Sequence, residues 1–123
     1  KKKSKIELNI KGRSFIIPFF YEGIARFDFK ELCDVNIGAE DYLEISNQCK
    51  FIIIENIPSF NKENSNQQNR FITLVDILYE KKIPLLISIS TNLNNLTSAN
   101  NLKEPFKRTV SRLYELTSPD INI

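Results

Sequence analysis

The sequence predicts an α/β fold, a mixed sheet of about five strands with an N-terminal β-hairpin, one βαβ unit and three main helices. Residues 5–10 alternate polar and apolar side chains, and the apolar run 15–17 follows a Lys-Gly-Arg turn, which is typical of a hairpin with one buried face. The apolar runs 50–54 and 85–89 have the near-continuous hydrophobicity of strands buried on both faces of a parallel sheet. The segment between them has helical periodicity, so strand, helix and strand over about forty residues predict a right-handed βαβ unit.

Local signals predict the remaining N-terminal elements. Pro18 has no backbone N–H, so it is expected to end the second hairpin strand or to lie at a sheet edge. Residues 23–29 alternate again and predict a third short strand, followed by one helical turn over residues 30–33. A helix is expected over residues 38–48, because acidic residues in its first turn suit the positive end of the helix dipole.

The C-terminal half predicts two longer helices. After a polar loop at 59–66, apolar residues recur at helical spacing within residues 67–82. An Asn-rich loop is expected over 91–103, with Pro105 as the first residue of a final helix that ends before Pro119. The two predicted apolar stripes are Phe71, Leu74, Val75 and Leu78, and then Phe106, Val110 and Leu113.

One domain is expected over residues 1–123, since that length buries a core without disulfide or metal staples. Residues 1–5, which carry four lysines, are expected to form a frayed and solvated end. Without these four of the 17 basic residues, 13 remain against 15 acidic ones, so nucleic acid is not an expected partner. The chain starts with Lys and contains no Met, from which we expect further residues upstream.

The composition excludes several kinds of chemistry. The chain has no His, which excludes Ser-His-Asp and Cys-His nucleophile systems and His-ligated zinc. Cys33 and Cys49 have no CxxC pattern and are expected to be reduced core residues of a cytosolic protein. No apolar run approaches the roughly 18 residues of a membrane span. We therefore expect no metal site in this chain and no membrane-spanning helix.

Two segments carry a resemblance to a known family. They are residues 69–80, NRFITLVDILYE, and residues 106–116, FKRTVSRLYEL. Both resemble signatures in the C-terminal region of the ZapE-type (Afg-like) AAA+ ATPases. Shorter matches occur in the same order at residues 26–27, 31–33 and 41–43. The resemblance covers residues 10–118, and several motifs in one order make it more specific than any single motif.

The resemblance implies ATP hydrolysis with ATP and Mg²⁺ in a full-length protein, but this chain lacks the phosphate-binding loop. Its glycines are Gly12, Gly23 and Gly38, and none precedes a Lys-Ser/Thr pair as in GxxxxGK[ST]. Such a loop needs glycine because backbone N–H groups must close around phosphate oxygens. In the family the loop lies upstream of the matched region. This chain is therefore expected to bind no cofactor alone and to need the N-terminal nucleotide-binding half as its partner.

Residues 52–56, IIIEN, resemble the apolar strand with an acidic end that binds Mg²⁺ in ATPases. The family often has Asp where this chain has Asn56, and Asn lacks the carboxylate charge that Mg²⁺ prefers. We favour the simpler interpretation, in which these residues form a buried strand whose polar end caps the next turn.

Arg108 and Arg112 are four residues apart, which places both on one face of the final helix, with Ser111 as a candidate supporting residue. Within the matched motif, either arginine could stabilise nucleotide phosphate in the same subunit or across an interface, since guanidinium offers paired donors and stays charged. The alternative is a surface helix with an Arg112–Glu115 pair that contributes a few tenths of a kcal/mol. Both interpretations stay open at this stage.

Arg70 and Asp76 belong to the other matched segment, and their separation places them on different faces of the helix. Arg70, beside a polar loop, is either a contact to a neighbouring subunit or a solvated residue at the helix start. Asp76 is expected to bond a nearby backbone group or an arginine such as Arg108. Elsewhere, the aromatic run 19–21 lacks flanking basic residues and is expected in the core or at a partner contact rather than stacked on bases.

The predicted function is that of the C-terminal, non-catalytic portion of a ZapE-like ATPase, which completes the ATPase body and presents arginines or a partner surface. For the full-length protein the resemblance implies action on client proteins, of the bacterial division ring or of organelle quality control. Self-association stays open. A cytoplasmic, bacterial location is expected, with attachment to a membrane surface left open. The alternative is a free-standing protein-binding remnant of a split ATPase gene.

Overall fold

The computed structural model describes residues 4–118, in which one sheet has five strands in the order β1-β2-β3-β4-β5. β1, β2 and β3 pair antiparallel, whereas β3, β4 and β5 pair parallel. The predicted α/β fold with a mixed sheet and an N-terminal hairpin is confirmed. The structure adds a second parallel crossover between β3 and β4, beside the predicted one between β4 and β5. The strands are β1 (Ser4–Ile10), β2 (Arg13–Tyr21), β3 (Ile24–Asp28), β4 (Phe51–Ile57) and β5 (Leu85–Ile89).

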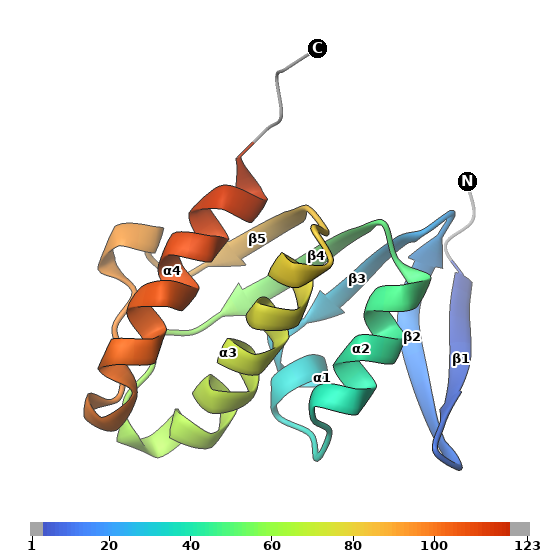
Figure 1. The fold of residues 1–123 in the computed structure, drawn as a ribbon, viewed down its shortest axis with the longest axis horizontal. Coiled ribbons are helices and arrows are strands. Elements are labelled where there is room, and N and C mark those ends of the chain that lie inside the picture. The colour runs from blue at the N-terminus through green and yellow to red at the C-terminus, as the bar shows by residue number, and fades with distance from the viewer. Residues whose placement is uncertain (1–3, 119–123) are drawn as a thin grey trace.

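The α-helices of the described residues all cover the same face of the sheet, and Figure 1 shows them in front of the strands. The three main helices that the sequence predicts correspond to the second, third and fourth of these. Short 3-10 helices occupy the loops before the two longest ones. The α-helices are α1 (Phe29–Cys33), α2 (Ala39–Gln48), α3 (Ser65–Glu80) and α4 (Lys103–Thr117), and the 3-10 helices are η1 (Lys62–Asn64), η2 (Leu93–Asn95) and η3 (Asn100–Leu102).

The short helix α1 begins where β3 ends, because Asp28 provides its N-terminal cap. The Asp28 carboxylate accepts from the backbone N–H of Lys30 at 3.1 Å, and Glu31 accepts from the backbone N–H of Asp28 at 2.8 Å. This capping box satisfies donors that the first helical turn leaves without partners. Asp28 therefore stands at the carboxyl end of a parallel strand, where the candidate site described below is found.

Four phenylalanine rings from distant parts of the chain form the centre of the core. Phe60, in the loop after β4, is 1% exposed, and its ring centre lies 5.7 Å from Phe29 of α1 and 5.8 Å from Phe71 of α3. The ring of Phe106 in α4 lies 5.5 Å from that of Phe60. Rings at such spacings contribute beyond the area that they bury. This phenylalanine cluster joins three helices to the end of β4.

Pro18 lies inside β2 rather than at its end, and β2 is flanked by strands on both sides, so the prediction for this residue was wrong. The register of β1 against β2 shifts here, because Ser4 pairs with Phe20 while Ile6 pairs with Ile17. One more residue of β2 than of β1 lies between these pairs. In a bulge the extra residue does not take part in the hydrogen bonds between the strands. A proline, which has no N–H to donate, is therefore accommodated there.

Several predicted boundaries shift. β1 begins at Ser4, so the frayed end expected over residues 1–5 was wrong for residues 4 and 5, and residues 1–3 lie outside the described part. The helix predicted to begin at residue 67 begins at Ser65, within the expected polar loop. The last helix begins at Lys103, and Pro105 is its third residue, where a missing N–H costs no intrahelical bond. Pro119 lies outside the described residues.

The expectation that the parallel strands are buried on both faces was also wrong. Ile52 and Ile54 of β4, which face the helices, are at most 1% exposed. On the opposite face, Leu86 of β5 is 56% exposed. The physical reason is the one-sided arrangement of the described helices, which leaves the second face of the sheet open.

Both cysteines are free thiols within the packed body of the fold. Burial raises the pKa of Cys33 from 9.0 to about 12, and that of Cys49 to about 11. Beside Cys33, the Tyr42 hydroxyl donates to the Leu32 carbonyl oxygen at 2.6 Å, and burial raises the pKa of this phenol too.

We expect the free energy of unfolding to fall as the pH rises above about 9, because unfolded thiols ionise there while the folded ones keep their protons. The folded pKa is the raised one, so the contribution of Cys33 is complete below pH 9.0 and is lost toward pH 12. From about pH 8 to about pH 10 this loss is about 1 kcal/mol. Urea unfolding of Cys33→Ala at both pH values should show a smaller decrease in the free energy of unfolding, because the contribution of Cys33 is absent. A pH dependence equal to that of the unsubstituted chain would contradict the assignment.

Candidate functional site

Residues from the two family-like segments meet where α3 packs against α4. Asp76 of α3 accepts from both arginines of α4, since Arg112 Nη1 donates to Oδ1 at 2.6 Å and Arg108 Nη2 donates to Oδ2 at 3.2 Å. The two arginines are one helical turn apart on the same face, so one carboxylate reaches both. The predicted bond between Asp76 and Arg108 is confirmed, and Arg112 joins it.

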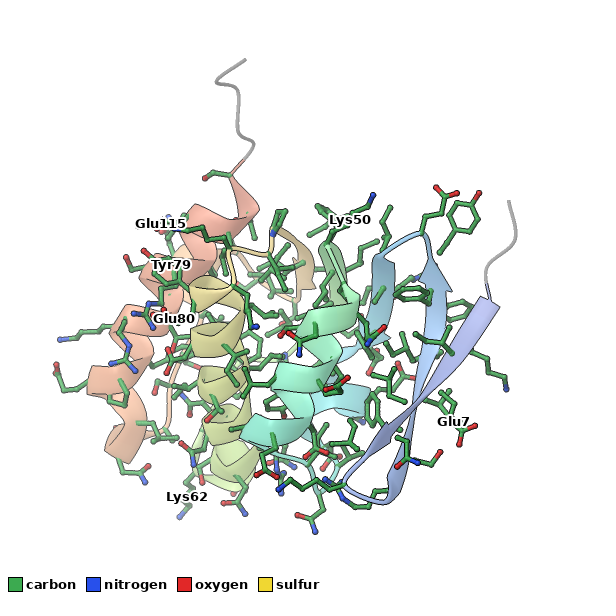
Figure 2. The ribbon with its side chains drawn as sticks, turned by 45° about the vertical axis from the view of Figure 1, so that its right-hand side comes forward. Glu7, Lys50, Lys62, Tyr79, Glu80 and Glu115 are labelled. Carbon is green, nitrogen blue, oxygen red and sulfur yellow. The ribbon has the colours of Figure 1, made fainter. Side chains whose placement is uncertain are left out.

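Tyr79 extends this group by one turn of α3. The guanidinium carbon of Arg112 lies 4.4 Å from the centre of the Tyr79 ring, where the ring face attracts a cation. The Tyr79 hydroxyl donates to Glu115 Oε1 at 2.8 Å, and Figure 2 shows the two side chains next to each other at one end of α3 and α4. This hydrogen bond raises the pKa of Tyr79. We call Asp76, Tyr79, Arg108, Arg112 and Glu115 the Asp76 cluster.

The Arg112–Glu115 pair of the surface-helix interpretation was wrong. In the described residues, Glu115 accepts from Tyr79, and the ion pair of Arg112 is with Asp76. A pair within one exposed helix contributes only about 0.2–0.5 kcal/mol. The contact between helices gives Arg112 a charge-assisted bond and a ring face together.

The two guanidinium groups differ in how far solvent reaches them. The side chain of Arg112 is 22% exposed, and that of Arg108 is 50% exposed. Arg112 also has the shorter bond to Asp76 and the contact with Tyr79. Arg108 therefore retains donors that an anion outside the cluster can reach, while Arg112 mainly fixes the position of α4.

The other two candidate residues lie outside the Asp76 cluster. Arg70 Nη1 donates to the Cys33 carbonyl oxygen at 3.0 Å, so this side chain holds the C-terminal end of α1 against α3. A cation at that end of a helix also suits its partial negative charge. Ser111 is exposed on α4 and is not one of the residues that bond Asp76.

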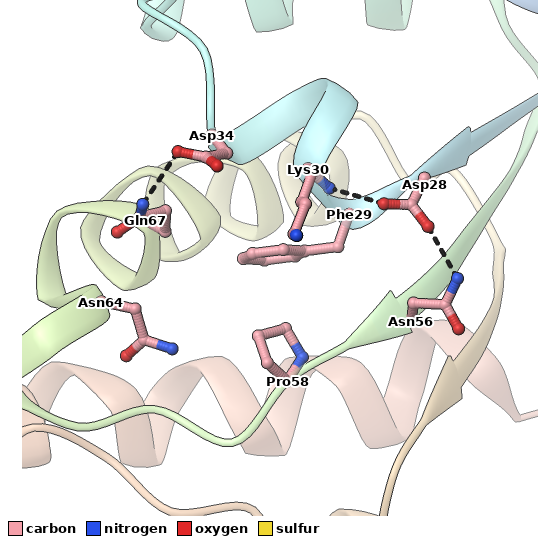
Figure 3. Close-up of a pocket in the computed structure, with 8 residues that line it drawn as sticks. All are labelled: Asp28, Phe29, Lys30, Asp34, Asn56, Pro58, Asn64 and Gln67. Carbon is pink, nitrogen blue, oxygen red and sulfur yellow. Dashed lines mark hydrogen bonds between the residues drawn. The ribbon is translucent and has the colours of Figure 1, made fainter.

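A second candidate site is a pocket of about 370 Å³ at the carboxyl ends of β3 and β4, shown in Figure 3. Ligands of open sheets with parallel strands bind outside the carboxyl ends of those strands. We call this the strand-end pocket. Its lining consists of Asp28, Phe29, Lys30, Asp34, Asn56, Pro58, Asn64 and Gln67.

Four polar side chains of the strand-end pocket bond in two pairs. Asn56 Nδ2 donates to Asp28 Oδ1 at 2.6 Å, while Asp28 Oδ2 accepts from the backbone of Lys30, so both carboxylate oxygens have donors. Gln67 Nε2 donates to Asp34 Oδ1 at 2.9 Å. The expectation that Asn56 caps the next turn was wrong, because its side chain joins the end of β4 to the end of β3. Its φ of 63° lies in the left-handed region, which Asn tolerates better than most residues.

Sequence reasoning missed the strand-end pocket, although a signal for it existed. Asp28 and Asn56 are polar residues at the ends of two strands that the sequence predicts, and parallel neighbours bring such ends together. In residues 4–118, no group of three or more His, Cys, Asp or Glu side chains is arranged to hold a metal ion. None of the helices in that range has the length and apolar character to cross a membrane.

The fold and the Asp76 cluster define an α/β protein region with helices on one side of a mixed sheet and an arginine–carboxylate cluster between two of them. Residues 1–122 match the family model of the AFG1-like ATPases. The chain belongs to this family, which confirms the resemblance found in its motifs.

Relatives from a vertebrate, a yeast and a bacterium match parts of the chain. Lactation elevated protein 1 homolog B of Danio rerio is 35% identical over 89 residues, which are 72% of this chain and 18% of that protein. An uncharacterized protein of Schizosaccharomyces pombe is 33% identical over 82 residues, 67% of this chain and 18% of its own length. The cell division protein ZapE of Escherichia coli K12 is 29% identical over 92 residues, 75% of this chain and 24% of ZapE. No solved structure matches the chain.

Proposed function

We propose that this chain is the C-terminal, non-catalytic portion of a ZapE-like ATPase, which completes the ATPase body and works only together with a nucleotide-binding portion. The observation that carries the proposal is a family match over residues 1–122 in a chain without GxxxxGK[ST]. The chain spans only 18% to 24% of the length of the relatives that it matches, so most of such an ATPase lies outside the matched region.

The positions of the three glycines support the proposal that the phosphate-binding loop lies in the nucleotide-binding portion. Gly12 and Gly23 have φ of 79° and 85° in the turns that connect β1 to β2 and β2 to β3, and Gly38 is the N-terminal cap of α2. Each is used by a local turn or helix start. A phosphate cradle instead needs several glycines in one loop, followed by a Lys and a Ser or Thr. In our proposal ATP and Mg²⁺ are held by the nucleotide-binding portion.

Within this proposal Arg108 faces the nucleotide phosphates, and Arg112 holds the helix that carries Arg108 in position. The half-exposed guanidinium of Arg108 supports the first role, since arginine donates paired N–H groups to phosphate oxygens. The contacts of Arg112 with Asp76 and Tyr79 support the second. The chain would thereby contribute an arginine to an ATP site that is formed mainly by the nucleotide-binding portion.

Two measurements test the proposal. Calorimetric titration of Mg²⁺·ATP into the 123-residue chain should detect no binding below millimolar concentration, and micromolar affinity would sink the idea. For turnover, the matched region of Escherichia coli ZapE is replaced by this chain. The chimera should hydrolyse ATP, whereas ZapE with that region deleted should not.

In the chimera, Arg108→Ala should lower ATP turnover at least about tenfold, because an arginine on the transferred phosphate stabilises charge in the transition state. Lys107→Ala is the matched control, since Lys107 is the neighbouring cation on α4 and pairs with the exposed Glu104. Normal turnover in both Arg108→Ala and Arg112→Ala would leave these residues with a structural role only. Turnover equal in the chimera and the deletion would instead favour a free-standing binding remnant.

A further inference from the structure

The sheet face opposite the helices carries a continuous group of exposed apolar side chains. Ile16 of β2 is 50% exposed, Ile24 of β3 is 40% exposed and Leu86 of β5 is 56% exposed. Phe19 and Tyr21 of β2 are each 43% exposed. We call Ile16, Phe19, Tyr21, Ile24, Ile53 and Leu86 the outer-face patch.

The strand register shows that this patch is one surface. Phe19 pairs with Arg26, Arg26 pairs with Ile53, and Ile53 pairs with Leu86, so a single row crosses β2, β3, β4 and β5. Tyr21 and Ile24 are paired in the adjacent row. Paired residues of neighbouring strands point to the same face of a sheet, so the side chains of these two rows lie together. Ile16 shares this face, since the next residue, Ile17, is fully buried on the other face, and it pairs with Glu7 of β1.

Arg26 and Glu55, which lie among the apolar residues of this face, form an ion pair. Arg26 Nε lies 3.2 Å from Glu55 Oε1, and the Arg26 guanidinium carbon lies 5.4 Å from the centre of the Phe19 ring. Arg26 of β3 pairs with Ile53 of β4, so Glu55 lies diagonally opposite Arg26, two residues further along β4. From β2 to β5 the patch therefore offers apolar area in which the one arginine is paired with an acid, and Glu7 lies beside Ile16 at its β1 side, which favours an apolar partner over a polyanion or an acidic peptide.

Strands β3, β4 and β5 form the parallel part of this mixed sheet, and parallel strands are almost always covered on both faces. Here α1 to α4 all cover the other face. The matched relatives have more than three quarters of their length outside the matched region, since at most 24% of any of them is covered. We infer that the outer-face patch is the surface on which apolar helix faces of the nucleotide-binding portion dock. This inference rests on the proposed function, and it identifies the surface through which the chain would contact the nucleotide-binding portion.

The test measures binding between this chain and Escherichia coli ZapE from which the matched region has been deleted. Leu86→Lys and Ile16→Lys replace residues that are more than a third exposed, so the chain itself should still fold. Each should weaken binding at least about tenfold, since a lysine would be buried against an apolar partner. Leu43→Lys is the matched control, because Leu43 of α2 is 42% exposed on the helix-bearing side. It should leave binding unchanged, and circular dichroism should show one fold for all three variants.

Other outcomes overturn the inference in distinguishable ways. If the chimera of ZapE hydrolyses ATP but binding is insensitive to Leu86→Lys and Ile16→Lys, the surface is wrong and the proposed function stands. The same conclusion follows if no binding in trans is found with an active chimera. If the chain alone sediments as a dimer that Leu86→Lys dissociates, the occupant is a second copy. An inactive chimera without binding overturns the function and the surface together.

Discussion

Phe60→Ala is expected to lower the free energy of unfolding by about 4 kcal/mol, which is a large part of the stability of a domain of this size. The ring is 1% exposed and lies within 5.8 Å of three other phenylalanine rings. Truncation leaves a cavity among α1, α3 and α4, because helices anchored by several other contacts relax only partly into it. Urea denaturation followed by far-UV circular dichroism measures the loss.

Leu43→Ala is the control for this substitution. Leu43 is also a large apolar residue, but it is 42% exposed on α2, so its truncation should cost less than about 1 kcal/mol. A loss below about 1 kcal/mol for Phe60→Ala would mean that the phenylalanine cluster does not hold the helices together. A similar loss in both variants would show that the effect of Phe60→Ala does not come from core packing.

Asp76→Asn is expected to destabilise the chain by about 2 kcal/mol. The substitution removes the charge that neutralises two guanidinium groups, one of which is only 22% exposed at its side chain. Most of the effect should come from Arg112, because the side chain of Arg108 is half exposed and exposed pairs contribute little. In the ZapE chimera the same change should lower ATP turnover, since it frees both arginines from their fixed positions.

A double-mutant cycle separates this effect from a general disturbance of α3. Asp76→Asn, Arg112→Gln and the combined variant should give a coupling free energy of about 1 kcal/mol or more. Glu104→Gln removes the charge from the exposed pair with Lys107 and should change stability by less than about 0.5 kcal/mol. Additive losses at Asp76 and Arg112 would contradict the contact between them.

Local sequence patterns predicted much of this fold because strands and helices follow the spacing of apolar residues. The stripe Phe71, Leu74, Val75 and Leu78 of α3 is buried as predicted. The hairpin turn and both predicted β4 and β5 strands also followed from local patterns. The bulge at Pro18 could not be predicted, since it depends on the register between two strands rather than on either strand alone.

The candidate sites depended on contacts between distant residues and were therefore predicted less well. The segment 106–116 placed Arg108 and Arg112 on one helix face, but it gave no sign that Arg112 would choose Asp76 over the local Glu115. Likewise, IIIEN predicted a strand with a polar end, but not the bond from Asn56 to Asp28 of another strand. Alternation in β3 and the apolar run of β4 identified apolar residues, yet neither pattern could show which sheet face the helices would leave open.

The bonds from Asp76 to Arg108 and Arg112 make the two family-like segments interdependent, although more than thirty residues separate Asp76 from either arginine. A substitution in one segment should therefore change which substitutions the other segment tolerates. We expect homologues that replace the acid to have altered the arginines as well, so that the trio is inherited or lost as one unit. The two family-like segments, residues 69–80 and 106–116, would then reflect one contact between α3 and α4 rather than two independent constraints.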